Sequence, residues 1–129
     1  MLAKRILVID DEANLCVVIK ICLEYLGGWQ VLTSQSGSEG LLLAETELPD
    51  AILLDVMMPD MNGLVLLHAL RINPVTRTIP VILLTARTQL VSSNESVQLG
   101  VVGIIPKPFD PIELSKLGKG IAEMGISQP

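Results

Sequence analysis

The chain has 129 residues, a net charge of -5 and 50% hydrophobic residues, which fits one globular domain with a substantial core. We expect residues 1–129 to form this single domain, with a short tail from about residue 125. The nine lysine and arginine residues are scattered, so no basic stripe is available for direct binding to nucleic acid. The apolar residues occur in short runs rather than in one spanning stretch, which argues against a membrane protein and favours a cytoplasmic one.

Short β-rich runs alternate with stretches of helical character along the chain. This order is typical of βαβ units with right-handed crossovers. The predicted strands cover residues 5–9, 30–33, 51–54, 80–84 and 102–105. A parallel sheet that is covered on both faces explains the high apolar content of these runs.

Helices are expected between the strands. The predicted ranges are residues 13–26, 38–48, 64–73, a short stretch from about 92, and a last helix from about 111. Gly27 and Gly28 are a strong stop signal for the first helix, and Pro49 and Pro74 limit the second and third. The predicted core residues of the first two helices are Leu15, Val18, Ile19, Cys22 and Leu26, and then Leu41, Leu42 and Ala44.

Reactive polar residues stand at the ends of four predicted strands. Asp10 and Asp11 follow the first strand, Asp55 the third, Thr85 the fourth, and Lys107 the fifth after one proline. Because the carboxyl ends of parallel strands meet at one edge of the sheet, these five side chains should lie together. Three carboxylates, a hydroxyl and an ammonium suit a carboxylate that accepts a phosphoryl group.

The chemistry of this predicted site requires a cation. Asp55, with a reference pKa of about 4, is ionised at neutral pH and needs no general base to attack phosphorus. The three carboxylates repel one another by up to about 4 kcal/mol per pair at about 4 Å if the effective dielectric constant is about 20, and Lys107 offsets only one charge. Mg²⁺, or Mn²⁺, would neutralise the remainder. Lys107 and the Thr85 hydroxyl would then hold phosphoryl oxygens.

These strand-end motifs together resemble the receiver domain of bacterial two-component response regulators. The motifs are Ile6-Leu7-Val8-Ile9-Asp10-Asp11-Glu12, Leu53-Leu54-Asp55-Val56-Met57-Met58-Pro59, Leu83-Leu84-Thr85-Ala86-Arg87 and Pro106-Lys107-Pro108-Phe109. The resemblance covers nearly the whole chain. It implies a flavodoxin-like (βα)5 three-layer sandwich with a parallel five-stranded sheet of order 2-1-3-4-5.

The resemblance also implies roles for individual residues. Asp55 would be phosphorylated from the phosphohistidine of a sensor histidine kinase or a histidine phosphotransfer protein. Asp11, Asp55 and the main-chain carbonyl of Met57 would bind Mg²⁺, Asp10 would act through metal-bound water, and the Lys107-Pro108 bond would be cis. Such a protein catalyses its own phosphorylation and dephosphorylation without being a turnover enzyme. Its phosphorylation would control a downstream protein or an output domain.

Receiver domains switch through a threonine and an aromatic residue on the fifth strand. Here Thr85 matches the threonine, and counting back from Lys107 puts Ile104 at the aromatic position, which departs from the family pattern. The apolar stretch 101–105 favours a contact surface formed by the fourth helix, the fifth strand and the fifth helix, where a homodimer could form. The alternative is that Ile104 packs inward.

Two other functions fit parts of the sequence. A phosphohydrolase could also use a strand-end aspartate and Mg²⁺, but the best-known superfamily of that kind carries Asp-x-Asp after the first strand, whereas this chain has adjacent Asp10 and Asp11. A protein-interaction module that works without phosphorylation would keep the fold. The filled acidic pocket argues against that module, and Ile104 argues mildly for it.

Overall fold

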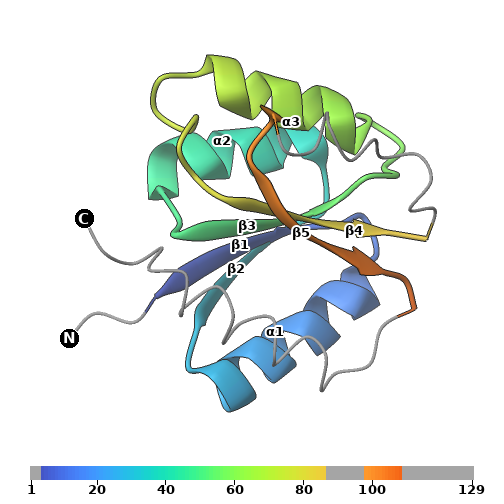
Figure 1. Ribbon diagram of the computed structural model, residues 1–129. Helices are drawn as coiled ribbons and strands as arrows, with labels where there is room; N and C mark the ends of the chain where they lie inside the picture. Colours follow the sequence, from blue (N-terminus) through green and yellow to red (C-terminus); the bar gives the residue numbers. More distant parts are fainter. Residues whose placement is uncertain (1–3, 87–97, 109–129) are drawn as a thin grey trace.

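The structure is a computed structural model that describes residues 4–86 and 98–108 (Figure 1). Its strands are β1 (Arg5–Ile9), β2 (Gln30–Ser34), β3 (Ala51–Asp55), β4 (Val81–Thr85) and β5 (Val101–Pro106). The helices assigned within these ranges are α1 (Ala13–Gly27), α2 (Gly37–Glu47) and α3 (Gly63–Ile72). The predicted helices from about residues 92 and 111, and the predicted tail, lie outside the described residues.

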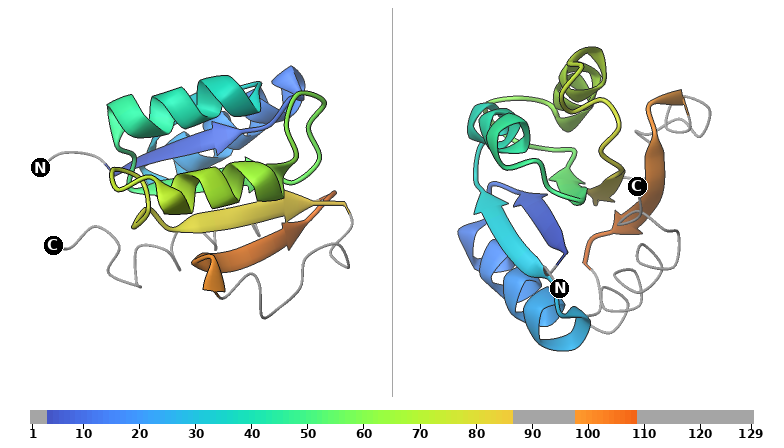
Figure 2. Two further views of the ribbon diagram at one scale, coloured as in Figure 1. Left: turned by 90° about the horizontal axis from the view of Figure 1, so that it is seen from above. Right: turned by 90° about the vertical axis from the view of Figure 1, so that its left-hand side faces the viewer.

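The five strands form one parallel sheet in the order β2-β1-β3-β4-β5. This order confirms the flavodoxin-like topology predicted from the sequence. Helix α1 covers one face of the sheet, and α2 and α3 cover the other, as both views in Figure 2 show. The result is a three-layer arrangement in which the carboxyl ends of β1, β3, β4 and β5 meet at one edge.

The core lies on both faces of the sheet. Along β1, Ile6 and Val8 pack into the cluster that contains α1, whereas Leu7 and Ile9 pack into the cluster that contains α2 and α3. This alternation follows the two-residue repeat of a strand. The continuous apolar runs of the sequence therefore serve a sheet that is buried on both sides. No helix in the described ranges is long and apolar enough to cross a membrane.

The fourth strand begins one residue later than predicted. Pro80 was expected to open it, but the ladder starts at Val81, which pairs with Ile52, and continues to Thr85, which pairs with Pro106. Proline has no N–H group to donate to a neighbouring strand, although the Pro80 carbonyl still accepts the Ile52 N–H at 3.0 Å. The strand ends at Thr85.

The predicted apolar face of α1 was partly wrong. The buried residues are Cys16, Ile19 and Leu23, and Val18 is 43% exposed. The Cys16 thiol donates to the main-chain oxygen of Asp10 at 3.3 Å, so the helix is turned with Cys16 against the sheet. Val18 stands about 100° around the axis from Ile19 and faces outward.

The stop at Gly28 was correct, because this residue ends α1 in the left-handed conformation with a φ of 69°. The Leu26 side chain is not among those the structure describes. In α2, Ala44 is buried as expected, but Leu42 is 59% exposed. Leu42 was a wrong core assignment because the helix packs on the sheet through Gly40 and Ala44, four residues apart and on one face.

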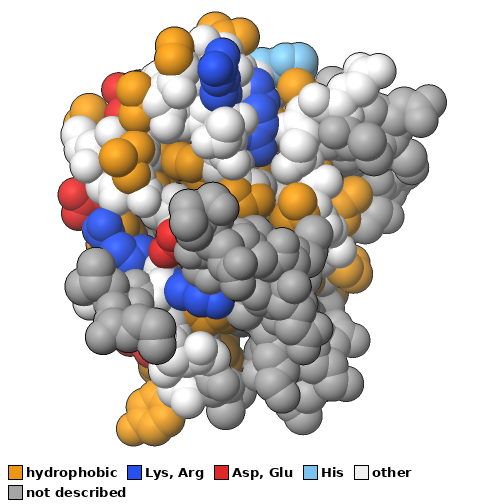
Figure 3. Space-filling view, turned by 60° about the vertical axis from the view of Figure 1, so that its left-hand side comes forward, with side chains coloured by type: hydrophobic (Ala, Val, Ile, Leu, Met, Phe, Trp, Pro, Cys, Tyr) orange, Lys and Arg blue, Asp and Glu red, His pale blue; other side chains and the backbone are white. Residues whose placement is uncertain are grey.

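Apolar side chains remain on the surface of β5. Val102 and Ile104 alternate along the strand and are each 38% exposed, so Ile104 is not packed inward. On the face shown in Figure 3, hydrophobic side chains lie in small groups between polar ones. Val102 and Ile104 are thus accessible in part, and the contact surface expected with the fourth and fifth helices stays a prediction.

Candidate functional site

Three aspartates meet at the carboxyl edge of the sheet. One carboxylate oxygen from each of Asp10, Asp11 and Asp55 lies within 4.8 Å of the other two. Asp10 directly follows β1, and Asp55 is the last residue of β3. Asp10 and Asp55 are buried, while Asp11 is more accessible to solvent. The arrangement brings together residues that are 45 positions apart in the chain because β1 and β3 are neighbours.

Lys107 supplies the positive charge of this cluster. Its Nζ atom lies 2.8 Å from Oδ2 of Asp10, 3.5 Å from Oδ2 of Asp55 and 3.5 Å from Oε1 of Glu12. Burial alone would lower the pKa of Lys107, but the hydrogen bond and charge of Asp10, followed by the charges of Asp55 and Glu12, raise this pKa above its ordinary value. The ammonium therefore stays charged at neutral pH.

The surroundings of Asp55 disfavour the charged form of its carboxyl group. Burial, and then the charge of Asp10, raise the pKa of Asp55 to about 6, against the opposing effects of the Met57 N–H and the Lys107 charge. The Met57 N–H donates to Oδ1 of Asp55 at 3.2 Å. One lysine does not offset the repulsion among the carboxylates, which leaves the site short of positive charge.

Thr85 and Lys107 are tied together through the main chain. The Lys107 N–H donates to the Thr85 carbonyl at 2.8 Å, and Thr85 is fully buried at the end of β4. The Lys107-Pro108 bond is cis, which confirms that prediction. Ile104 pairs with Leu83 in the sheet, two residues before Thr85, and its side chain is partly exposed.

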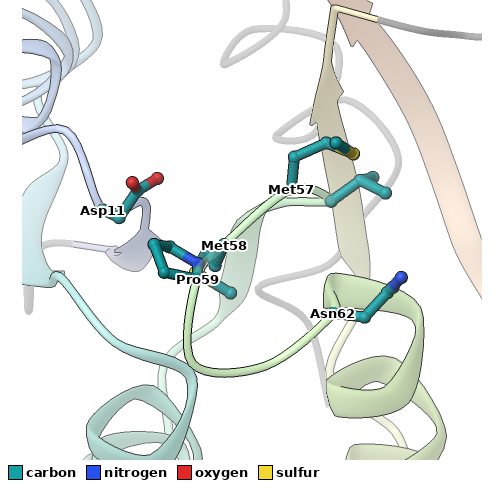
Figure 4. Close-up of a pocket in the computed structure, with 6 residues that line it drawn as sticks. Asp11, Met57, Met58, Pro59 and Asn62 are labelled. Carbon is teal, nitrogen blue, oxygen red and sulfur yellow. The ribbon is translucent and has the colours of Figure 1, made fainter.

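Met57 lies on the loop that follows β3 and borders a pocket beside the aspartates. The pocket has a volume of about 360 Å³, and its lining residues are Asp11, Val56, Met57, Met58, Pro59 and Asn62. Figure 4 shows Asp11 on one side and Met57, Met58 and Pro59 on the facing loop. The pocket thus opens between the loop after β1 and the loop after β3.

The donor set fits a hard divalent cation. Carboxylate oxygens are the ligands that Mg²⁺ prefers in proteins, and the three aspartates present them within bonding reach of one ion. A bound cation would also offset the burial and the Asp10 charge that together raise the pKa of Asp55. The residues present therefore match the ion that the sequence predicted.

Two contacts near the site were not assigned a role from the sequence. Glu12 reaches Lys107, and its position directly after Asp10 and Asp11 was the available signal. Cys16 lies beneath Asp10, and burial followed by the Asp10 charge raises the pKa of its thiol to about 11. The thiol is therefore protonated at neutral pH and behaves as a small buried side chain.

The chain belongs to the response regulator receiver domain family, whose family model matches residues 6–118. It is accordingly a receiver domain of the two-component signalling systems. The members of this family are signalling proteins, and the family is not a classical enzyme family. They work with histidine kinases and output domains. Phosphorylation and Mg²⁺ binding at an acidic pocket are typical of it.

Individual relatives agree with this assignment. The chain is 36% identical over 118 residues to the alkaline phosphatase synthesis transcriptional regulatory protein PhoP of Bacillus subtilis, covering 92% of this chain and 48% of PhoP. It also matches the chemotaxis response regulator CheY4 of Vibrio cholerae with a TM-score of 0.83 and 28% identity, covering 93% of this chain and 99% of that one.

A third match concerns the metal. The receiver domain of the sensor histidine kinase PA1611 of Pseudomonas aeruginosa, solved with a magnesium ion coordinated in its active site cleft, has a TM-score of 0.81 and 28% identity, with coverage of 94% and 99%. The chain spans about half or less of the length of the curated relatives it matches.

Proposed function

We propose that this receiver domain accepts a phosphoryl group on Asp55 from the phosphohistidine of a sensor histidine kinase or a histidine phosphotransfer protein. Asp11, Asp55 and the main-chain carbonyl of Met57 would bind Mg²⁺, or Mn²⁺, and Asp10 would contribute to the metal site through metal-bound water. The observation that carries the proposal is the buried Asp55 carboxylate, 3.5 Å from the Lys107 ammonium and next to two further carboxylates.

The residues divide the chemistry among them. An oxygen of Asp55 forms a bond to phosphorus as the bond from phosphorus to the donor nitrogen breaks, and the imidazole leaves. Lys107 and the Thr85 hydroxyl bind phosphoryl oxygens and stabilise their charge. Mg²⁺ would supply the positive charge that lets an anionic donor approach three carboxylates. The chain is modified once in each cycle, so we propose a signalling switch and not a turnover enzyme.

The proposal is tested with acetyl phosphate as a small phosphodonor. Incubation of the protein with acetyl phosphate and Mg²⁺ should add one phosphoryl group to the intact mass, and EDTA should prevent the addition. Asp55→Asn should remove it, because an amide is a poor nucleophile. Asp50→Asn is the matched control: Asp50 lies at the opposite end of β3 and accepts the Arg5 N–H at 2.8 Å, which an asparagine oxygen can also accept.

An unmodified wild-type protein under these conditions would count against phosphorylation. It would favour the alternative function, a protein-interaction module of the same fold that works without a phosphoryl group. Many turnovers of phosphate per chain from small phosphoesters would instead favour a phosphohydrolase. If Asp55→Asn and Asp50→Asn lost the modification equally, the loss could not be assigned to Asp55 as the phosphorylated residue.

We also propose that Thr85 and Ile104 transmit the phosphorylated state to a downstream protein or an output domain. The exposure of Ile104 and its pairing with Leu83, two residues before Thr85 on β4, support a role in contact. A homodimer through the face that includes β5 belongs to the same proposal. Ile104→Glu should weaken binding of the phosphorylated protein to that partner, or to itself, while leaving phosphorylation intact. Unchanged association measured by sedimentation and by partner pull-down would contradict this role.

The remaining expectations from the sequence are part of the proposal as well. We propose that residues 1–129 form one domain, which the family match over 6–118 supports, and that the protein acts in the cytoplasm. Output to DNA would require another domain or chain, because the receiver itself carries only scattered basic residues.

A further inference from the structure

The loop after β3 is tied to the first turn of α2 by a carboxylate. The Gly37 N–H donates to both side-chain oxygens of Asp60, at 3.1 and 3.0 Å, and the Ser38 N–H donates to Oδ2 at 3.4 Å. These amides belong to the start of a helix, whose N–H groups have no partner within the helix. Ser36 is the N-cap residue of α2 and accepts the Glu39 N–H at 3.2 Å. Asp60, 23 residues from Gly37, accepts the two preceding amides of the same turn.

Packing reinforces this tie. Gly37 is buried, and a Cβ atom at this position would lie only 2.8 Å from Cβ of Met61. The loop therefore rests directly on the helix backbone, where glycine alone leaves enough space. The hydrogen bonds of Asp60 and the contact of Met61 hold adjacent residues of the loop against the same point of α2.

The start of α2 is also connected to Asp10. The Asp10 N–H donates to the Ser34 carbonyl at 3.0 Å. The Ser34 hydroxyl donates to the Ser36 carbonyl at 2.9 Å and accepts the Ser36 N–H at 3.4 Å. Gly37 follows Ser36 directly. One short segment, residues 34–38, thus contacts both the strand end that carries Asp10 and the loop that follows Asp55.

The two ends of the loop between β3 and α3 are joined by a hydrogen bond. The Gly63 N–H donates to the Val56 carbonyl at 2.8 Å, and Asn62 caps α3 by accepting the Leu64 N–H at 2.8 Å. Between these anchors stands Met57, whose main-chain carbonyl is the proposed metal ligand. The Met57 N–H also donates to Oδ1 of Asp55 at 3.2 Å, and the later residues of the turn, Asp60 and Met61, are held by their contacts with α2.

We propose that Asp60 is a positioning residue that sets the affinity of the site for Mg²⁺. By holding the loop on α2, it keeps the Met57 segment at a fixed distance from Asp10 and Asp11. The inference rests on the proposed metal site but concerns a residue that does not touch the metal. Residues that orient metal ligands without touching the metal typically contribute about 10- to 100-fold to metal affinity. For Asp60 we expect an effect of about tenfold.

The test is Mg²⁺ titration by calorimetry at constant ionic strength on the wild-type chain, Asp60→Ala, Asp60→Asn and Glu39→Gln. Asp60→Ala should raise the dissociation constant about tenfold. Asp60→Asn keeps one acceptor oxygen, so its dissociation constant for Mg²⁺ should lie between those of Asp60→Ala and the wild type. Glu39→Gln removes an exposed negative charge from the same turn of α2 and should bind Mg²⁺ as the wild type does. Circular dichroism at the titration temperature verifies that each variant is folded.

A second readout separates positioning from a general loss of structure. In the acetyl phosphate reaction, Asp60→Ala should need about tenfold more Mg²⁺ for half-maximal rate and should approach the wild-type rate at saturating Mg²⁺. An unchanged dissociation constant in the alanine variant, or an equal loss in Glu39→Gln, would overturn the inference. Absence of Mg²⁺ binding to the wild-type chain would instead overturn the proposed function, and the inference with it.

Discussion

Asp55 is held in a place that disfavours its own charge. The side chain is buried, Asp10 stands beside it, and the pKa of Asp55 is raised to about 6. A carboxyl group whose pKa is raised on folding destabilises the folded state once it is ionised. The proposed phosphoacceptor is therefore a source of instability in the metal-free protein.

Replacing Asp55 should consequently stabilise the metal-free protein. Asp55→Asn removes the buried charge and keeps an oxygen that can accept the Met57 N–H. We expect the free energy of unfolding at pH 7 to rise by about 2 kcal/mol and the melting temperature by roughly 6 °C. Thermal unfolding in EDTA measures this, and calorimetry should find weaker Mg²⁺ binding. A lower melting temperature would contradict electrostatic strain at the site.

The same strain predicts a pH dependence. Asp55 has a pKa of about 6 in the folded chain and of about 4 in the unfolded chain, so the folded state binds more protons between these values. Its contribution to stability should therefore fall as the pH rises from about 4 to about 6. Urea unfolding in EDTA should find the stability gain of Asp55→Asn small near pH 4 and complete by pH 7. A gain that is constant across this range would argue against titration of Asp55.

At the scale of elements, the site depends on how closely α3 approaches β3. A Cβ atom at Gly63 would press against the Asp55 main-chain oxygen and lie 2.6 Å from Cα of Val56. Both neighbours belong to the main chain of the sheet and cannot turn aside as a side chain can. The first residue of α3 must therefore be glycine for the helix to begin beside Asp55.

Gly63→Ala should accordingly destabilise the protein by about 2 kcal/mol or more, because overpacking a tight contact forces the backbone to shift. Val65→Ala on the same helix is the control, since Val65 is 57% exposed and its truncation should change stability by less than about 0.5 kcal/mol. Urea unfolding compares the two variants. An equal loss of stability in the two variants would mean that the close approach of Gly63 to β3 does not exclude a larger residue at this position.

Arg71 connects α3 to the segment before β5. Its guanidinium donates to the carbonyls of Leu99 and Gly100, and also to those of Thr76 and Arg77 after α3. Burial lowers the pKa of Arg71, yet arginine remains charged at neutral pH. Strand β5 is thereby held at its beginning by Arg71, and just past its end by the hydrogen bond from the Lys107 N–H to the Thr85 carbonyl.

At the scale of the whole molecule, the fold gathers four strand ends that would be far apart in an extended chain. The Lys107 ammonium and the Asp10 carboxylate are 97 residues apart and lie 2.8 Å from each other. Assembly of the proposed metal site therefore requires the complete sheet. Binding of an ion at this edge should stabilise the entire domain.

Mg²⁺ should thus raise the melting temperature of the wild-type chain. A ligand that binds only the folded state at 100 times its dissociation constant adds about 2.7 kcal/mol, which corresponds to roughly 8 °C. Thermal unfolding across a Mg²⁺ series at constant ionic strength measures the gain. Asp55→Asn should gain less, and an equal gain in both proteins would indicate that the ion binds elsewhere.

The sequence by itself determined the strands, the stop of α1 at Gly28 and the set of polar residues at the strand ends. Apolar runs, glycine signals and residues that directly follow a strand are local features, and they remain valid wherever the strand is placed. The family motifs then gave the strand order. Together these features predicted that Asp10, Asp11 and Asp55 would meet near Lys107.

Only the tertiary structure decided which residues of each helix are buried and which distant groups touch. Val18 and Leu42 fit an apolar repeat, but the rotation of each helix on the sheet, fixed at Cys16 and Gly40, turns them outward. The hydrogen bonds of Asp60 to α2 leave no trace in local sequence. Their energy depends on elements that approach one another only after the chain has folded, and a pattern of neighbouring residues does not record that geometry.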